Sequence, residues 1–92
     1  MGKRTENSEM AKAVALRYIP QKDQAPVVVA KGSGFIAEQI KEVARESGIP
    51  LKEDQELVKY LMSLDLYEEI PPHLYAIIAE ILAFIYSMDR EY

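Results

Sequence analysis

The first third of the chain contains two runs whose apolar spacing is typical of β-strands. In residues 13–18, large side chains alternate with small or polar ones, the pattern of a strand with one face in the core. The large side chains are Val14, Leu16 and Tyr18. Residues 27–30 are a mostly β-branched run, which indicates a strand buried on both faces. Pro20 cannot donate to a sheet ladder, so we predict two strands joined by a loop that begins near this proline.

An amphipathic helix and a third strand are predicted next. Ser33 is a suitable N-cap for a helix that runs to about Ser47, and Gly48 stands where a glycine commonly ends a helix. One face of this helix is expected to meet the sheet. It carries Ile36, Ile40, Val43, Ala44 and Ser47. Residues 49–52 are predicted to form a short strand, since a strand, helix and strand of these lengths make a right-handed crossover between parallel strands.

Two further helices follow. Asp54 can cap a helix that extends to about Leu64, and its inward side is apolar. That side carries Leu57, Val58, Leu61 and Leu64. Pro71-Pro72 begins the last helix, whose apolar stripe is wider than one contact with a sheet requires. The stripe comprises Leu74, Ile77, Ile78, Ile81, Leu82, Ile85 and Met88. The predicted fold is α/β: a small mixed β-sheet of about three strands, with one βαβ crossover, surrounded by three helices.

Length and composition agree with this picture. A chain of 92 residues is long enough for one domain, and we expect residues 1–12 to be a flexible tail and residues 13–92 the domain. The absence of cysteine excludes disulfides and thiolate metal sites. The net charge of −4 argues against nucleic acid as a partner, because phosphates need a basic surface. The longest apolar stretch contains Glu80 and is too short to span a bilayer, so we expect a cytoplasmic protein with no membrane span. The pattern indicates no particular oligomeric state.

Few residues suggest chemistry. Gly32-Ser33-Gly34 precedes a helix N-terminus, where free N–H groups and the helix dipole can hold an anion. The spacing matches neither GxxxxGK[ST] nor GxGxxG, so a simple glycine turn is the stronger interpretation. The single histidine, His73, has no nucleophile or orienting partner in the pattern beyond Glu69, and one histidine cannot build a typical zinc site. We therefore predict no enzyme activity, no metal site and no cofactor.

The order of residues also resembles a known family. The run AVALRY, seven loop residues and PVVVAKG resemble the C-terminal cytoplasmic domain of the FlhB family of flagellar and virulence type III export. The likeness continues through Gly48-Ile49-Pro50, Glu69-Ile70-Pro71, Leu74-Tyr75 and residues 79–83, and covers residues 13 to about 88. The resemblance implies a domain of the export apparatus that works by binding other proteins.

One departure from the family pattern concerns self-cleavage. Family members carry Asn-Pro-Thr-His before the first of these strands and cleave themselves after the Asn, whereas the matching positions here are Ser8-Glu9-Met10-Ala11. The transmembrane half of FlhB and the apolar strand before the cleavage motif are also missing from this sequence. We therefore expect a free-standing homologue that does not cleave itself.

The resemblance implies one binding surface. In the family, an apolar surface beside the second strand and on the last helix is implicated in receiving export substrates. The matching positions are Ala25, Pro26, Ala79 and Leu82. The alternative for these residues is that they only bury the loop against the helix. We expect a non-enzymatic accessory of type III export, which binds export components or substrates. A small regulatory domain that binds an anion or nucleotide at Gly32-Ser33-Gly34 is the alternative function.

Overall fold

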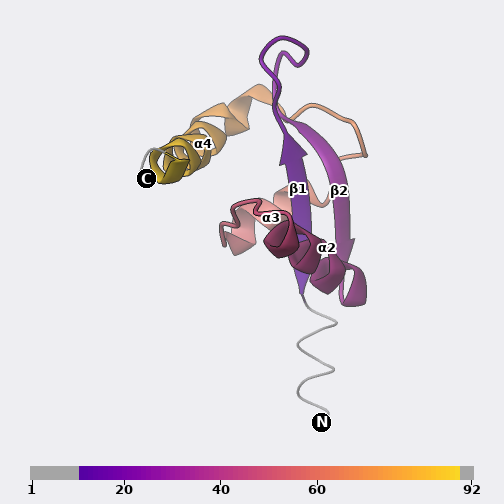
Figure 1. Ribbon diagram of the computed structural model, residues 1–92. Coiled ribbons are helices and arrows are strands. Elements are labelled where there is room, and N and C mark those ends of the chain that lie inside the picture. The colour runs from indigo at the N-terminus through magenta and orange to yellow at the C-terminus, as the bar shows by residue number, and fades with distance from the viewer. Residues whose placement is uncertain (1–10, 90–92) are drawn as a thin grey trace.

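Figure 1 shows the computed structural model of the protein as a ribbon. The structure describes the backbone of residues 11–89 and the side chains of residues 11–82. Two strands come first, followed by three helices, the last of which begins with a short 3-10 turn. The elements are β1 (Lys12–Arg17), β2 (Val27–Ser33), α2 (Phe35–Glu46), α3 (Gln55–Leu61), η1 (Pro72–Leu74) and α4 (Tyr75–Asp89). The predicted α/β class and the three helices are confirmed.

The two strands form an antiparallel pair in which Val14 lies opposite Lys31 and Ala13 lies opposite Gly32. A bulge interrupts the register after Ala15, and β2 continues to Ser33, three residues beyond the predicted end. The alternation predicted for the first strand is confirmed. Val14 and Leu16 pack against the main hydrophobic core, whereas Ala13 is buried outside that cluster and so belongs to the other face.

The predicted third strand is not formed. Within residues 11–89 the sheet has two strands, and residues 49–52 form no strand, so the parallel crossover is absent. The second edge of β2 is occupied instead by a segment much later in the chain. The Val28 N–H donates to the Glu68 carbonyl at 3.0 Å, and the Ile70 N–H donates to the Pro26 carbonyl at 2.9 Å. These bonds place residues 67–70 antiparallel to the start of β2, where a crossover strand would otherwise pair.

Helix α2 meets the sheet through smaller side chains than predicted. Its buried residues are Ala37 and Ala44, whereas Ile36 and Val43 remain exposed. A Cβ added to Gly32 would lie 2.3 Å from Cγ2 of Ile36, so the helix passes very close to the β2 backbone. Gly32 on the strand and the two alanines on the helix allow this close approach. The helix therefore turns its alanine side toward the sheet. The predicted apolar face was therefore wrong in its orientation, although Ala44 is buried as expected.

The start of α2 also differs from the prediction. Ser33 ends β2 and does not cap the helix. The N-cap is Gly34, with φ of 61°, and no side chain bonds the first turn. An L side chain rarely adopts that φ, so glycine relieves strain at this position.

The main core lies on the opposite face of the sheet from α2. Its buried members are Ala25, Val28, Leu57, Leu61, Leu64, Ile70, Leu74 and Ile78. Asp54 caps α3 as predicted, accepting a hydrogen bond from the Leu57 N–H at 3.0 Å, although the helix ends at Leu61 rather than near Leu64. Lys31 donates to the carbonyls of Met62 and Leu64 and so ties β2 to the residues that follow α3. Because Lys31 and Gly32 are neighbours on a strand, they point to opposite faces, and the sheet is covered on both.

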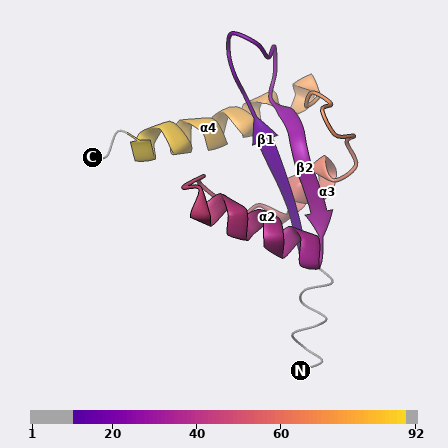
Figure 2. The same cartoon turned by 45° about the vertical axis from the view of Figure 1, so that its right-hand side comes forward.

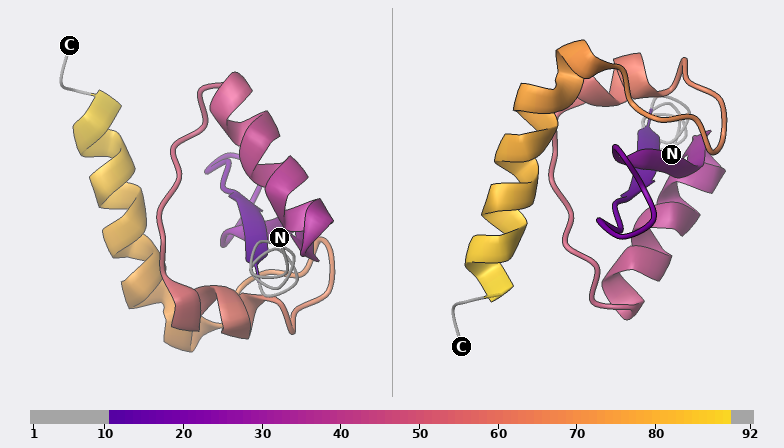
Figure 3. Two further views of the ribbon diagram at one scale, coloured as in Figure 1. Left: turned by 90° about the horizontal axis from the view of Figure 1, so that it is seen from below. Right: turned by 90° about the horizontal axis from the view of Figure 1, so that it is seen from above.

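The first part of helix α4 packs against this core. Leu74 of η1 and Ile78 of α4 are buried, while Tyr75 and Ile77 are exposed. Ile81 and Leu82 are partly buried against the same core. Figures 2 and 3 show α4 extending away from the sheet, with its far end apart from the other elements. Among the described residues, no helix has the length and hydropathy needed to cross a membrane.

Candidate functional site

A hollow of about 210 Å³ lies between α4 and the loop that joins β1 to β2. Its lining residues are Tyr18, Gln24, Ala25, Pro26, Ile70, Tyr75, Ile78, Ala79 and Leu82. All four residues predicted for the binding surface are in this list, although two of them are more than fifty residues from the other two. The structure therefore brings the predicted site residues together in one concave surface.

The four residues contribute in different ways. Ala25 is only 2 % exposed and belongs to the core, so it forms part of the floor rather than an open surface. Pro26 is partly buried, and its carbonyl accepts the hydrogen bond from Ile70 that fixes this end of the loop. Ala79 is exposed on α4, and Leu82, one turn later, is partly buried against the core. The alternative interpretation, that these residues only bury the loop against the helix, therefore applies to Ala25. Ala79 is exposed and can contact a partner.

The loop is held in shape by an ion pair that the sequence pattern did not reveal. Arg17 donates two hydrogen bonds to Asp23, from Nη2 to Oδ1 at 2.8 Å and from Nε to Oδ2 at 3.1 Å. The Ile19 N–H donates to Oδ2 of the same carboxylate at 2.9 Å. Two-point pairing of this kind is geometrically specific as well as strong. The only signal in the sequence was an arginine at a strand end with an aspartate six residues later.

The electrostatics of the loop follow from this geometry. The hydrogen bonds from Arg17 and from the Ile19 backbone hold the pKa of Asp23 below its ordinary value of 3.8, against the opposing effect of burial. The same pairing raises the pKa of Arg17. Asp23 is therefore charged at neutral pH and fixes the loop in one conformation.

The lining of the hollow suits contact with an apolar group. Most of its side chains are aliphatic, and the two tyrosines supply polar hydroxyls attached to apolar rings. Pockets of this composition, with few polar groups, typically receive hydrophobic ligands or side chains. Within the described residues, no group of three or more His, Asp or Glu side chains could hold a metal. The described residues that line the hollow include no Asp, Glu, His, Lys or Arg, so they offer no acid–base pair for proton transfer.

The other predicted candidates lie elsewhere. The rings of His73 and Tyr60 meet in a T-shaped contact, with centroids 5.3 Å apart and planes at 79°. At the glycine turn, the Gly34 N–H already donates to the Ala11 carbonyl at 2.8 Å. Glu38 lies in the first turn of α2, where its negative charge disfavours a bound anion. The turn therefore serves to connect β2 to α2.

Comparison with known proteins identifies the family. A model described as the FlhB HrpN YscU SpaS Family matches residues 10–85. The chain belongs to this family. The resemblance expected from the residue pattern is thus confirmed, and the match extends from β1 through α2 and α3 to residue 85 of α4.

Individual relatives fall into two groups by length. The chain is 44 % identical over 85 residues to YlqH of Bacillus subtilis, a protein described as uncharacterized, and covers 91 % of it. It is 46 % identical over 74 residues to the flagellar biosynthetic protein FlhB of Aquifex aeolicus. That match takes in 79 % of this chain but only 21 % of FlhB. The chain therefore spans nearly all of the first relative and about a fifth of the second.

Solved structures share the fold. The cytoplasmic domain of FlhB from Shewanella putrefaciens superimposes with a TM-score of 0.80 at 31 % identity, covering 86 % of this chain and 65 % of that one. The PscU C-terminal domain gives a TM-score of 0.76 at 26 % identity, covering 82 % of this chain and 96 % of that one. The family fold is therefore present although the described sheet has two strands.

Proposed function

We propose that this protein is a non-enzymatic, protein-binding accessory of flagellar or related type III export, acting in the cytoplasm on export components or export substrates. Membership of the FlhB family supports a role in export. The hollow between α4 and the loop supports binding rather than catalysis, because its lining offers apolar contact and no reactive pair. The observation that carries the proposal is that Ala25, Pro26, Ala79 and Leu82 line one hollow.

The size of the hollow indicates what it receives. An apolar cavity of about 150 Å³ is large enough to hold benzene. At about 210 Å³, the hollow can accept one large apolar side chain of a partner. Such a side chain, seated in a pocket and surrounded by less critical contacts, is the usual form of a binding hot spot. The tyrosines Tyr18 and Tyr75, both half-exposed, would then cover the sides of the inserted group.

We also propose that the chain does not cleave itself. Cleavage of the family type needs an asparagine side chain that attacks its own backbone carbonyl. Ser8-Glu9-Met10-Ala11 stands at the matching positions and has neither that asparagine nor the proline that shapes the turn. Residues 8–10 lie outside the described residues, so this part of the proposal rests on the sequence.

Site-directed crosslinking tests the binding role. A photoreactive phenylalanine analogue at position 79 is expected to form adducts with export components or substrates in a flagellated host, and mass spectrometry identifies them. Position 76 provides the matched control, because Ala76 is exposed on the same helix but does not line the hollow. Equal adducts from both positions, or adducts confined to proteins outside the export system, would contradict the proposal.

A further inference from the structure

The apolar side of α2 is a second surface that the proposed function does not use. Because the helix turns its alanine side toward the sheet, Ile36 is 48 % exposed and Val43 is 57 % exposed. Ile40 is partly exposed as well. At 100° per residue, these three side chains lie within about 60° of one another around the helix axis, so they form one stripe. Such a stripe on a helix normally faces a core.

Ile49 extends this stripe beyond the end of α2. Gly48, with φ of 72°, follows the helix, and its N–H donates to the Arg45 carbonyl at 3.2 Å. The Ile49 N–H donates to the Ala44 carbonyl at 2.8 Å. This pair of bonds is the Schellman motif, which commonly brings the residue after the glycine against the last turn of the helix. Ile49 is 56 % exposed. We call the four residues Ile36, Ile40, Val43 and Ile49 the α2 stripe.

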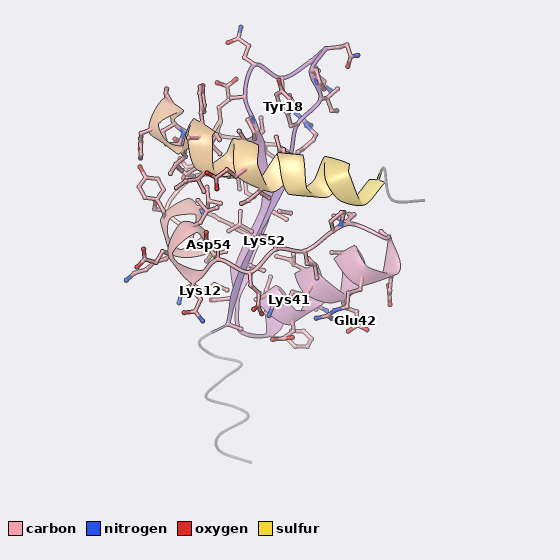
Figure 4. The ribbon with its side chains drawn as sticks, turned by 90° about the vertical axis from the view of Figure 1, so that its left-hand side faces the viewer. Lys12, Tyr18, Lys41, Glu42, Lys52 and Asp54 are labelled. Carbon is pink, nitrogen blue, oxygen red and sulfur yellow. The ribbon has the colours of Figure 1, made fainter. Side chains whose placement is uncertain are left out.

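The helix that carries the α2 stripe is held firmly in place. It packs against both strands, and Ala37 and Ala44 are buried. At its start, the Gly34 N–H donates to the Ala11 carbonyl at 2.8 Å, which ties the helix to the beginning of β1. In Figure 4, α2 runs along the lower margin of the described chain, and Glu42 is labelled on it. A partner would therefore meet a preformed surface, which lowers the entropy cost of binding.

The charges on the open flank of the α2 stripe are acidic. At 100° per residue, Glu46 lies about 60° and Glu42 about 100° around the helix from Val43, on the flank turned away from the sheet. Lys41 and Arg45 lie about 160° from Val43, on the far side of the helix. Neither glutamate takes part in an ion pair within the described chain, so both carboxylates remain available. An apolar stripe with this flank is complementary to a partner that is apolar and basic.

We propose that the α2 stripe receives an amphipathic helix of another protein, which packs its apolar side on the stripe and carries Lys or Arg opposite Glu42 and Glu46. Apolar side chains spaced three and four residues apart are the usual anchors of a docked helix. The two carboxylates favour the orientation that brings the basic flank to them, because complementary charges across an interface fix its register. The hollow is lined by the β1–β2 loop, Ile70 and α4, so the two surfaces are separate.

Two other occupants fit less well. A second copy packed antiparallel on the same stripe would bring the flank with Glu42 and Glu46 against the identical flank of the first copy, and like charges brought together at an interface are unfavourable. Residues 1–10 of the same chain precede Ala11, which is bonded to the start of α2. Their sequence, MGKRTENSEM, contains no apolar residue between its two methionines, so it cannot cover four aliphatic side chains.

Two synthetic helical peptides test the proposal on the whole protein. Both carry the same stripe of leucine and isoleucine, but one has lysine and arginine along its flanks and the other has glutamate. By fluorescence anisotropy, the basic peptide should bind at least about tenfold more tightly than the acidic one. Val43→Glu and Ile49→Glu should each weaken binding of the basic peptide at least about tenfold, as expected for a charge placed inside an interface. Leu66→Glu is the matched control and should bind as the wild type does. Leu66 is 50 % exposed and precedes residues 67–70, which lie beside the start of β2, whereas α2 follows the end of that strand.

Charge reversal gives a second readout that leaves the stripe itself intact. When Glu42→Lys and Glu46→Lys are combined, the preference should invert, and the acidic peptide should bind more tightly than the basic one. The proposal is wrong if the wild type binds neither peptide or both equally, if the combined variant keeps the wild-type preference, or if a folded Val43→Glu binds the basic peptide undiminished.

Three controls identify other occupants of the stripe. A wild-type dimer that Val43→Glu dissociates would indicate a second copy and would overturn the proposal. Tighter peptide binding after removal of residues 1–10 would indicate that these residues cover the stripe, and would overturn it as well. Ala79→Glu, which alters the hollow, should leave peptide binding unchanged, and a loss of binding in this variant would place the peptide at the hollow instead.

Discussion

Gly32 marks the closest approach between α2 and the sheet, and substitution by alanine tests how tightly the two are packed. The added Cβ would lie 2.3 Å from Cγ2 and 2.8 Å from Cβ of Ile36. The second contact matters more, because a Cβ cannot move by rotamer change and the helix backbone must shift. Overpacking of this kind typically costs about 1–3 kcal/mol. Loss of glycine flexibility in the unfolded chain offsets roughly 0.4–1 kcal/mol of this cost.

We therefore expect Gly32→Ala to lower the free energy of unfolding by about 1–2 kcal/mol. For a domain of this size, each kcal/mol corresponds to roughly 4–8 °C in Tm. Urea and thermal denaturation followed by circular dichroism measure both quantities. The hollow does not involve this contact, so the variant should keep the binding properties of the hollow below its Tm.

A double-mutant cycle assigns the cost to the contact with Ile36. Ile36→Ala removes Cγ2 from a side chain that is about half exposed, so alone it should have a small effect. Combined with Gly32→Ala, it should recover part of the lost stability, giving a coupling energy of about 0.5 kcal/mol or more. If Gly32→Ala is as stable as the wild type, or if the two effects simply add, the close packing inferred here is wrong.

Three further predictions concern the loop, the cap of α3 and the N-terminal segment. Because Arg17 lowers the pKa of Asp23, the pair stabilises the fold above the unfolded-state pKa, about 3.9, and its contribution is lost as pH falls through the lower folded-state value. Urea denaturation from pH 6 to pH 2 should show the gap between wild type and Asp23→Asn closing in acid, and a constant gap would contradict this. Asp54→Ala should lower the free energy of unfolding by about 1 kcal/mol through loss of the bond to the Leu57 N–H, whereas Asp54→Asn should retain most of it. Intact-mass spectrometry after several days at neutral pH should show one uncleaved chain, and two fragments that divide near Ser8 would refute the proposal on self-cleavage.

Local sequence patterns predicted those features that are determined by contacts within a single helix or strand. The alternation in residues 13–18 and the Asp54 cap both describe contacts within a few residues, and both are confirmed. The predicted strand at residues 49–52 failed because strand formation requires a neighbour. That neighbour of β2 proved to be residues 67–70, whose Tyr-Glu-Glu-Ile sequence carries no strand pattern.

The orientation of α2 was mispredicted for a related reason. The spacing of Ile36 and Val43 indicates that one side of the helix is apolar. It carries no information on the shape of the surface that the helix packs against. At Gly32 and Ala13 that surface is so shallow that Ala37 and Ala44 fit against it better than larger side chains do. Packing between elements thus determined which face of the helix was buried.

The hollow could be anticipated only through the family resemblance. Ala25 and Pro26 lie in a loop, Ala79 and Leu82 lie on the last helix, and no periodicity connects them. Tyr18 and Tyr75, which also line the hollow, were not among the predicted site residues, although tyrosine is enriched at binding interfaces. The ion pair that fixes the loop depends on a turn geometry that the sequence does not specify.

The Arg17–Asp23 pair has a thermodynamic consequence for any partner of the hollow. A loop already fixed by three hydrogen bonds to one carboxylate loses little conformational entropy when a ligand arrives, so the wall of the hollow exists before binding. Association should then proceed with a single kinetic phase and a negative heat-capacity change from apolar burial. Cutting the pair would slow recognition without altering any atom that the partner touches. An aspartate outside the hollow would thereby govern how readily the hollow can be used.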